Sequence, residues 1–270
     1  MRNNIMLGQF LPGDSPIHRL DPRTKLISMV LYIVLVFLVK ALPVFVPPAL
    51  LLVLMFLLAR VPASYFLSSL KPLRWLIVFM FVLNLFFTPG ETVLLQWRFI
   101  VVTREALRQA AYITLRLVLL VAGTSMLTLT TSPIALTDGL ERLLMPLSVI
   151  RFPAHELAMM MTIALRFIPT LMEETERIQK AQMARGADFE SGNLVNRAKS
   201  MIPILVPLFV SAFRRADELA MAMESRCYPG GEGRTRMREL HFALRDAVAL
   251  IVMAAVIAAV VLLQRLVFRV

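Results

Sequence analysis

Five long apolar runs limit what this chain can fold into. They cover approximately residues 26–39, 43–59, 73–88, 106–130 and 242–263. The hydrocarbon core of a bilayer needs roughly 20 mostly apolar residues in a helix, and about 17–25 are tolerated. Hydrophobic residues make up 58% of the chain, whereas about 45–50% is usual for a soluble domain. The sequence therefore predicts an all-α integral membrane protein with about five transmembrane helices.

The first run is preceded by "LDPRTKL", a stretch with the features of a helix start. Asp21 belongs to the residue types that cap helix N-termini, and Pro22 suits the first helical position. We expect the Asp21 carboxylate to accept the backbone N–H of Thr24. Asp21, Pro22 and Arg23 are thus predicted to begin the first membrane helix.

The distribution of basic residues predicts the orientation of the chain. The N-terminal segment, residues 60–74 and residues 131–239 together hold 21 of the 29 Lys and Arg residues, and the segments on the other side hold 5. Cytoplasmic segments of membrane proteins carry the excess of Lys and Arg. We therefore expect a multi-pass protein of the cell membrane with its N-terminus in the cytoplasm.

Residues 131–240 carry helical patterns that are too charged to cross a bilayer. We expect a short helix near 134–147 and two long ones at about 154–185 and 194–226. Each long helix would extend roughly 50 Å at about 1.5 Å per residue. The third contains a 13-residue apolar core that is interrupted by Pro203 and Pro207 and is too short to span. Two tilted or re-entrant helices in a seven-span protein are the alternative.

The helix predicted at 154–185 is amphipathic. Its apolar positions follow the i, i+3, i+4, i+7 spacing of one helix face, and they are Leu157, Met160, Met161, Ala164, Leu165, Ile168, Leu171 and Met172. The predicted organisation is thus an N-terminal segment with four membrane helices (1–130), a cytoplasmic helical segment (131–240) and a last membrane helix (241–270).

Both long helices end in an arginine between small residues. The first ends at Ala184, Arg185 and Gly186, and the second ends 41 positions later, at Ser225, Arg226 and Cys227. An arginine there can simply bond the last free carbonyls and complement the helix dipole. Small neighbours would also let the planar guanidinium enter a groove and pair with carboxylates or amides.

Several chemistries have no support in the sequence. There is no Gly-Lys dipeptide and hence no Walker-type phosphate loop, and the HExxH, CxxC and G-x-S-x-G patterns are absent. Cys227 and the three histidines have no metal-ligand spacing. Basic residues lie in loops between apolar runs, without a basic helix or interleaved aromatics, so no nucleic-acid partner is predicted. We expect no catalytic site, metal or cofactor in this chain.

Taken together, "HRLDPRTKL", "KAQMARG" and "AMESRCYPGGEGRTRMREL" resemble the transmembrane T component of energy-coupling factor (ECF) transporters, the EcfT/CbiQ family. The resemblance extends over nearly the whole chain in length, number of spans and order of motifs. It implies a non-catalytic subunit of a prokaryotic ABC importer for vitamins or trace metals. Its implied partners are two cytoplasmic ATPases, which bind ATP and Mg, a substrate-binding membrane protein called the S component, and the lipid bilayer.

The resemblance also assigns roles to residues. Short Arg-centred motifs, commonly Ala-Arg-Gly, close the two coupling helices of the family and dock in grooves of the ATPases. Residues 184–186 match that motif fully, whereas residues 225–227 keep only the arginine. The predicted face toward the S component and the membrane surface comprises Leu157, Met160, Met161, Ala164 and Ile168.

Two other interpretations stay open at this point. A multi-span membrane enzyme or channel would use Arg108, Arg116 and the cytoplasmic helices as a polar site, because arginines within a span need water, headgroups or partners. An ordinary ABC permease subunit would carry its own substrate path. The sequence does not name the transported substrate.

Overall fold

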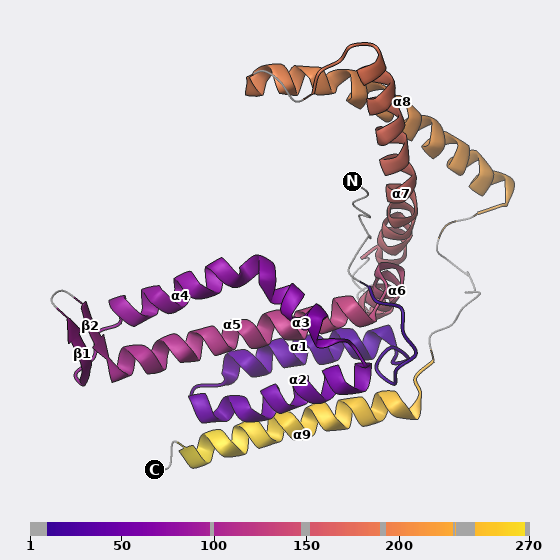
Figure 1. Ribbon diagram of the computed structural model, residues 1–270. Helices are drawn as coiled ribbons and strands as arrows, with labels where there is room; N and C mark the ends of the chain where they lie inside the picture. Colours follow the sequence, from indigo (N-terminus) through magenta and orange to yellow (C-terminus); the bar gives the residue numbers. More distant parts are fainter. Residues whose placement is uncertain are drawn as a thin grey trace. The chain divides into compact units, whose positions relative to one another are not determined.

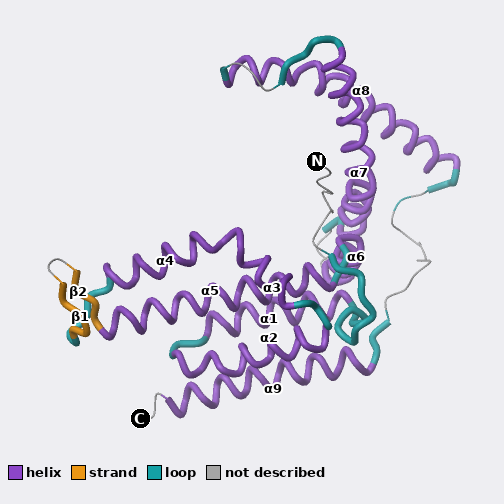
Figure 2. The backbone as a smooth tube through the Cα atoms, viewed as in Figure 1, coloured by secondary structure: helices purple, strands orange, loops and turns teal. Residues whose placement is uncertain are grey.

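The computed structural model describes residues 10–97, 100–146, 152–189, 193–228, 230 and 241–267. Most of these residues are helical (Figures 1 and 2), which confirms the predicted all-α class. The elements are α1 (Pro22–Leu38), η1 (Leu42–Phe45), α2 (Val46–Ala59), α3 (Ala63–Leu70), η2 (Lys71–Leu73), α4 (Arg74–Phe87), β1 (Val93–Trp97), β2 (Ile100–Thr103), α5 (Arg104–Thr130), α6 (Pro133–Leu144), α7 (Ala154–Ala184), α8 (Leu194–Ser225) and α9 (Leu244–Val267).

Among the residues that the structure describes, four helical stretches are long and apolar enough to cross a membrane. They are Leu42–Ala59, Ser64–Phe87, Arg104–Thr130 and Leu244–Val267. The second is longer than the predicted run at 73–88, because α3 and η2 lead directly into α4. The first predicted run forms α1, whose 17 residues extend only about 26 Å. An antiparallel β1–β2 hairpin precedes α5, in a segment where only a loop was expected.

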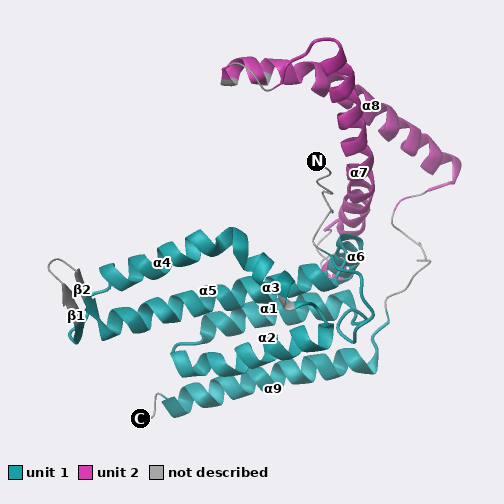
Figure 3. Ribbon diagram, in the orientation of Figure 1, with its two compact units in different colours: residues 1–143, 239–270 teal, residues 144–238 magenta. Residues whose placement is uncertain are grey.

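The chain divides into two compact units (Figure 3). Unit 1 comprises residues 1–143 and 239–270, and unit 2 comprises residues 144–238. In unit 1, α1, α2, α5 and α9 enclose an apolar core that includes Leu35, Val36 and Phe45. Trp75 and Phe87 of α4 are 73% and 79% exposed. Large apolar side chains turned outward suit a lipid surface, where their exposure carries no hydrophobic penalty.

Polar side chains from two neighbouring helices satisfy the C-terminus of α1. Arg116 Nη2 and Tyr112 Oη of α5 donate to Val39 O at 2.8 and 2.6 Å, and Gln264 Nε2 of α9 donates to Leu38 O at 3.2 Å. The last carbonyls of a helix have no partner within the helix, and leaving them unpaired in hydrocarbon costs several kcal/mol. Arg116 is therefore bonded to the C-terminal end of α1.

The N-terminus of α1 is joined to the N-terminus of α9. The Asp21 carboxylate accepts Arg23 N at 2.8 Å, so the predicted cap exists but bonds Arg23 rather than Thr24. The backbone N–H of Asp21 donates to Asp246 Oδ1 at 2.8 Å. Asp246 Oδ2 accepts Ala243 N at 2.8 Å, so this buried carboxylate holds two helix starts together.

Lys25 and Gly139 bring two further elements, α5 and α6, to the start of α1. Lys25 Nζ donates to Thr130 O at the end of α5, at 2.9 Å, and to His18 O at 3.0 Å. At Gly139 of α6, a Cβ would lie 2.9 Å from Pro22 Cβ, so only glycine allows this approach. The "LDPRTKL" stretch therefore contacts the end of α5, α6 and the start of α9. In the sequence, α6 directly precedes unit 2 and α9 follows it.

Unit 2 is built on the long helices α7 and α8, whose bounds match the predicted 154–185 and 194–226 within one residue. α8 continues through Pro203 and Pro207, as the predicted range requires. Proline at 207 has no N–H to donate to the carbonyl of residue 203. Gln182 Nε2 of α7 donates to Pro203 O at 3.4 Å, so α7 supplies a donor where α8 lacks one. The predicted end of the short helix at 147 lies outside the described residues.

Candidate functional site

The C-terminus of α7 is closed by backbone hydrogen bonds. Gly186 N donates to Met183 O and Ala187 N donates to Gln182 O, both at 3.0 Å. Gly186 has φ 87°, a left-handed conformation that glycine adopts without a Cβ penalty. This combination of bonds is a Schellman motif, with Arg185 as the last residue before the left-handed one.

The C-terminus of α8 has the same geometry. Cys227 N donates to Glu224 O at 2.8 Å, and Tyr228 N donates to Met223 O at 3.1 Å. Cys227 has φ 54° and takes the left-handed position that Gly186 has in α7. Arg226 therefore corresponds to Arg185 in backbone geometry as well as in sequence. We call residues 184–186 and 225–227 the two arginine tips.

The guanidinium groups take no part in closing either helix. All six residues of the two arginine tips are exposed. Within the part of the chain that the structure describes, neither Arg185 nor Arg226 makes a side-chain hydrogen bond or ion pair. Since backbone N–H groups already satisfy the last carbonyls, the guanidinium donors of both arginines remain available to a partner.

The two helices are fastened to each other at a polar contact. Glu174 of α7 accepts Ser211 Oγ and Arg215 Nη2 of α8, each at 2.7 Å. The Ser211 hydroxyl, together with the Arg215 guanidinium, holds the pKa of the Glu174 carboxyl below its ordinary value. Glu174 and Arg215 each lie eleven positions before the arginine of their own helix. About 16 Å of helix therefore separates this contact from each arginine tip.

The predicted apolar face of α7 is largely open to a partner. Met160, Met161, Ala164 and Ile168 are exposed and Leu157 is half-buried. The buried positions near the start of α7 are Ala154 and Ala158. The five residues lie on one helical side, as their spacing predicts, and their role toward a partner stays a prediction.

A second apolar face, on α8, was not among the predicted site residues. It consists of exposed side chains at helical spacing, namely Met201, Ile202, Leu205, Val206, Phe209, Val210 and Phe213. The same periodicity was readable in "MIPILVPLFVSAF", but that run looked like an apolar core interrupted by prolines. Unit 2 thus exposes apolar faces on both long helices, and contiguous apolar surface of this kind marks an interaction site.

The arginines of α5 do not form the polar site that the enzyme or channel interpretation needs. Arg116 bonds the end of α1 and lies over the rings of Tyr112 and Phe37 at 4.6 and 5.7 Å from their centroids. Arg108 is exposed. Among the described residues, no three His, Cys, Asp or Glu side chains are grouped so as to hold a metal ion.

Comparison with known proteins finds relatives over nearly the whole chain. Residues 13–237 match the family described as Cobalt transport protein, CbiQ. The energy-coupling factor transporter transmembrane protein EcfT of Clostridium kluyveri is 56% identical over 250 residues, which cover 92% of this chain and 93% of the relative. The EcfT proteins of Thermanaerovibrio acidaminovorans and Bacillus subtilis are 53% and 49% identical, covering 97% and 95% of this chain and 97% and 98% of each relative. These matches include both units.

Proposed function

The chain belongs to the CbiQ/EcfT family of transmembrane transport proteins, and on this basis we propose that it is the coupling subunit of an ECF-type ABC importer. In this proposal two cytoplasmic ATPases bind ATP and Mg, and an S component in the membrane binds a vitamin or a trace metal. This chain performs no chemistry itself. It transmits the motion of the ATPases to the S component.

The observation that carries this proposal is the pair of arginine tips. Each presents one exposed guanidinium from a helix end whose backbone is already closed. A planar guanidinium that is not needed by its own helix can pair with carboxylates or amides in a groove of a partner. Two tips of one geometry suit two ATPase subunits of related structure.

The contact at Glu174 gives the two helices a way to move together. Ser211 and Arg215 of α8 bond one carboxylate of α7, so a displacement of one arginine tip is transmitted to the other helix rather than absorbed by sliding. Helices bonded in this way act as levers with arms of about 16 Å. Closing of the ATPases upon ATP binding would then turn α7 and α8 as a pair.

The apolar faces of unit 2 are the surfaces on which the S component would bind. Met160 and Met161 of α7 are flexible, polarisable side chains, which suit surfaces that accept more than one partner. Exposed aromatic side chains, such as Phe209 and Phe213, line the face of α8. Motion of these faces would tilt or release the S component.

An apolar pocket in unit 1 favours a separate substrate-binding subunit over a permease with its own substrate path. The pocket lies among α1, α2, α5 and α9 and is lined mostly by Leu, Met, Val and Ile side chains. Apart from Lys25, Arg245 and a few hydroxyl groups, the wall is apolar, and it supplies neither ligands for a metal ion nor the several hydrogen-bond partners that a polar vitamin needs.

The proposed topology places the N-terminus and unit 2 in the cytoplasm. Cys227 is the single cysteine of the chain and is exposed, so it reports the location of α8 without any engineering. A membrane-impermeant thiol reagent should label Cys227 only after cells that produce this chain without ATPases are permeabilised. Labelling of intact cells would reverse the topology.

Co-purification tests the assignment as a whole. The chain carrying a C-terminal affinity tag is isolated from its native membrane in mild detergent, and the bound chains are identified by mass spectrometry. We expect ABC ATPase subunits together with a small membrane protein that binds the substrate. Transport by the purified chain with ATPases alone would instead favour the permease interpretation.

A further inference from the structure

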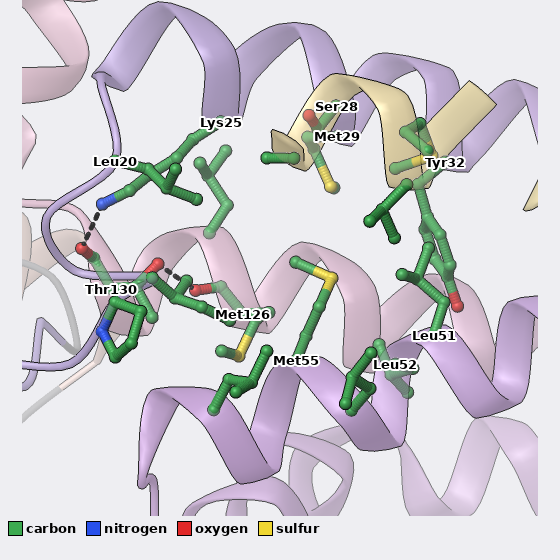
Figure 4. A pocket seen from close by; sticks show the side chains of 18 of the residues that line it. Leu20, Lys25, Ser28, Met29, Tyr32, Leu51, Leu52, Met55, Met126 and Thr130 are labelled. Atoms are coloured by element: carbon green, nitrogen blue, oxygen red, sulfur yellow. Dashed lines mark hydrogen bonds between the residues drawn. The ribbon is translucent and has the colours of Figure 1, made fainter. Parts of the chain in front are cut away.

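The pocket in unit 1 is a distinct apolar trough of about 490 Å³ (Figure 4). This volume lies within the roughly 300–1,000 Å³ of small-molecule sites. It is far smaller than the volume of a transmembrane helix, which is about 10–12 Å across with its side chains and about 30 Å long. Met55 of α2 and Met126 of α5 both line it, as Figure 4 shows. The trough therefore has room for a slender apolar ligand.

Small residues and one aromatic ring create this space. Gly123 lies against Tyr32, where a Cβ would come within 2.4 Å of the ring. The Tyr32 hydroxyl donates to Leu119 O at 3.4 Å, which fixes the ring at one end of the trough. Ser28 of α1 and Ala249 of α9 are further small residues in its lining.

The trough opens toward the surroundings of unit 1 between α2 and α9. Its lining residues on α1 and α5 are buried or half-buried. By contrast, Leu58 of α2 and Val248 of α9 line the trough and are still 45% and 50% exposed. α1 and α5 thus form the floor, and α2 and α9 form the two rims. Both rims belong to candidate membrane spans, so the opening faces lipid.

The end of the trough opposite Tyr32 is cationic. Lys25 lines it and uses two of its three ammonium donors on Thr130 O and His18 O. Arg245, in the first turn of α9, also lines the trough and is exposed. An apolar trough with basic groups at one end matches an amphiphile with an anionic head. Positive charge near a membrane surface attracts anionic lipids by about 1 kcal/mol per residue, or roughly fivefold.

We propose that the trough binds one acyl chain of an anionic phospholipid whose phosphate lies at Arg245. The chain would lie between the α2 and α9 rims, over the floor made by Ser28, Gly123 and Met126. Such a lipid would occupy unit 1 next to the place where α1, α5 and α9 are joined. The proposal requires only that unit 1 lies in a bilayer, and it does not depend on the partners of unit 2.

Photolabelling in nanodiscs tests the proposal with the full chain. The bilayer contains phosphatidylcholine with a trace of phosphatidylglycerol that carries a diazirine on its acyl chain, and a second sample carries the diazirine on phosphatidylcholine. Cross-linked residues are mapped by mass spectrometry. We expect Met55 and Met126 to be labelled about fivefold more by the anionic probe than by the zwitterionic one.

Two variants and a matched control make the result decisive. Ala249→Phe fills the trough and should lower labelling of Met126 about tenfold, whereas Ala247→Phe, at an exposed position that does not line the trough, should change it less than about twofold. Arg245→Gln should leave the folded protein intact and abolish the preference for the anionic probe. The proposal is overturned if Met126 is labelled no more than outward-facing Ile251 or if Ala249→Phe has no effect.

Discussion

Gly186 and Cys227 have the same left-handed backbone conformation, each one residue beyond an arginine that ends a long helix. Left-handed φ costs a residue with a side chain about 1–2 kcal/mol and costs glycine nothing comparable. The second arginine tip is therefore less stable than the first for a reason that lies in Cys227. Gly186 and Cys227 therefore occupy equivalent backbone positions of the two tips, and only glycine adopts this conformation without a cost.

Substitutions at Cys227 and at Gly186 should have opposite effects on the stability of the helix ends that contain them. Cys227→Gly should protect the Tyr228 amide from hydrogen exchange about five- to tenfold, because glycine removes roughly 1 kcal/mol of backbone strain. Gly186→Ala should lower protection of the Ala187 amide by a similar factor, since a Cβ there meets no other atom within 4 Å and the cost is in the backbone alone. Equal protection in Cys227→Gly and the natural chain would contradict the shared cap geometry.

The Gln182 side chain should matter only while residue 207 is proline. Gln182→Leu should destabilise the α7–α8 pair by about 0.5–1.5 kcal/mol, because the Pro203 carbonyl loses its donor. In a Pro207→Ala background, the new N–H can bond that carbonyl within α8, and the same change should cost almost nothing. A double-mutant cycle on thermal unfolding measures the difference. Equal costs in both backgrounds would show that Gln182 contributes by packing.

The α7–α8 contact should weaken in acid. The lowered pKa of Glu174 means that its carboxylate binds protons less readily when folded than when unfolded. Its stabilisation is therefore complete above the ordinary value of 4.5 and is lost as pH falls through 4.5 toward the lower folded value. The melting temperature of Glu174→Gln should lie below that of the natural chain at pH 6, and the difference should disappear once the pH falls below the lowered folded pKa. A difference that is independent of pH would contradict the role of the charge.

Asp246 should be among the most sensitive polar residues of unit 1. It is 1% exposed and accepts the backbone N–H groups of both Asp21 and Ala243. Asp246→Ala leaves two buried donors unpaired and should cost about 1–3 kcal/mol for each. Asp217→Ala, at an exposed position of α8, is the control and should change the melting temperature little. A small effect of Asp246→Ala would mean that α9 is held by apolar packing alone.

Local sequence signals predicted the elements of unit 2 well. The i, i+3, i+4 spacing and the turn-forming residues gave α7 and α8 within one residue. The tolerance of Pro203 and Pro207 could not be read from α8 alone, because the replacement donor, Gln182, comes from another helix. The left-handed conformation of Cys227 was also hidden, since cysteine is not a residue that signals such a turn.

Long-range contacts account for what the sequence did not show in unit 1. "LDPRTKL" predicted a helix start correctly, but its bond to Asp246 joins residues 225 positions apart. From the sequence alone, Arg116 was a candidate for a polar site, because no partner for it was visible nearby. Its acceptors are the carbonyls at the end of α1, and only the packing of α1 against α5 brings them to Arg116. The β1–β2 hairpin was missed because its apolar residues were judged only by their capacity to span a bilayer.

We propose that Arg185 and Arg226 bind the ATPases. The most direct test measures the affinity of purified ATPases for the chain in nanodiscs. The Arg185→Glu/Arg226→Glu variant is compared with the control Lys180→Glu/Arg214→Glu, which reverses exposed charges on the same two helices. An interface hot spot is worth on the order of 2 kcal/mol or about 30-fold in affinity, and Glu would repel acidic groups in the grooves. We predict that the double tip variant loses binding by more than about 100-fold while it stays folded and monodisperse. Arg185→Lys should be clearly weakened, and the control should bind within about threefold of the natural chain. Binding of the double tip variant within threefold of the natural chain would show that the two arginines only finish their helices, and would contradict the coupling role.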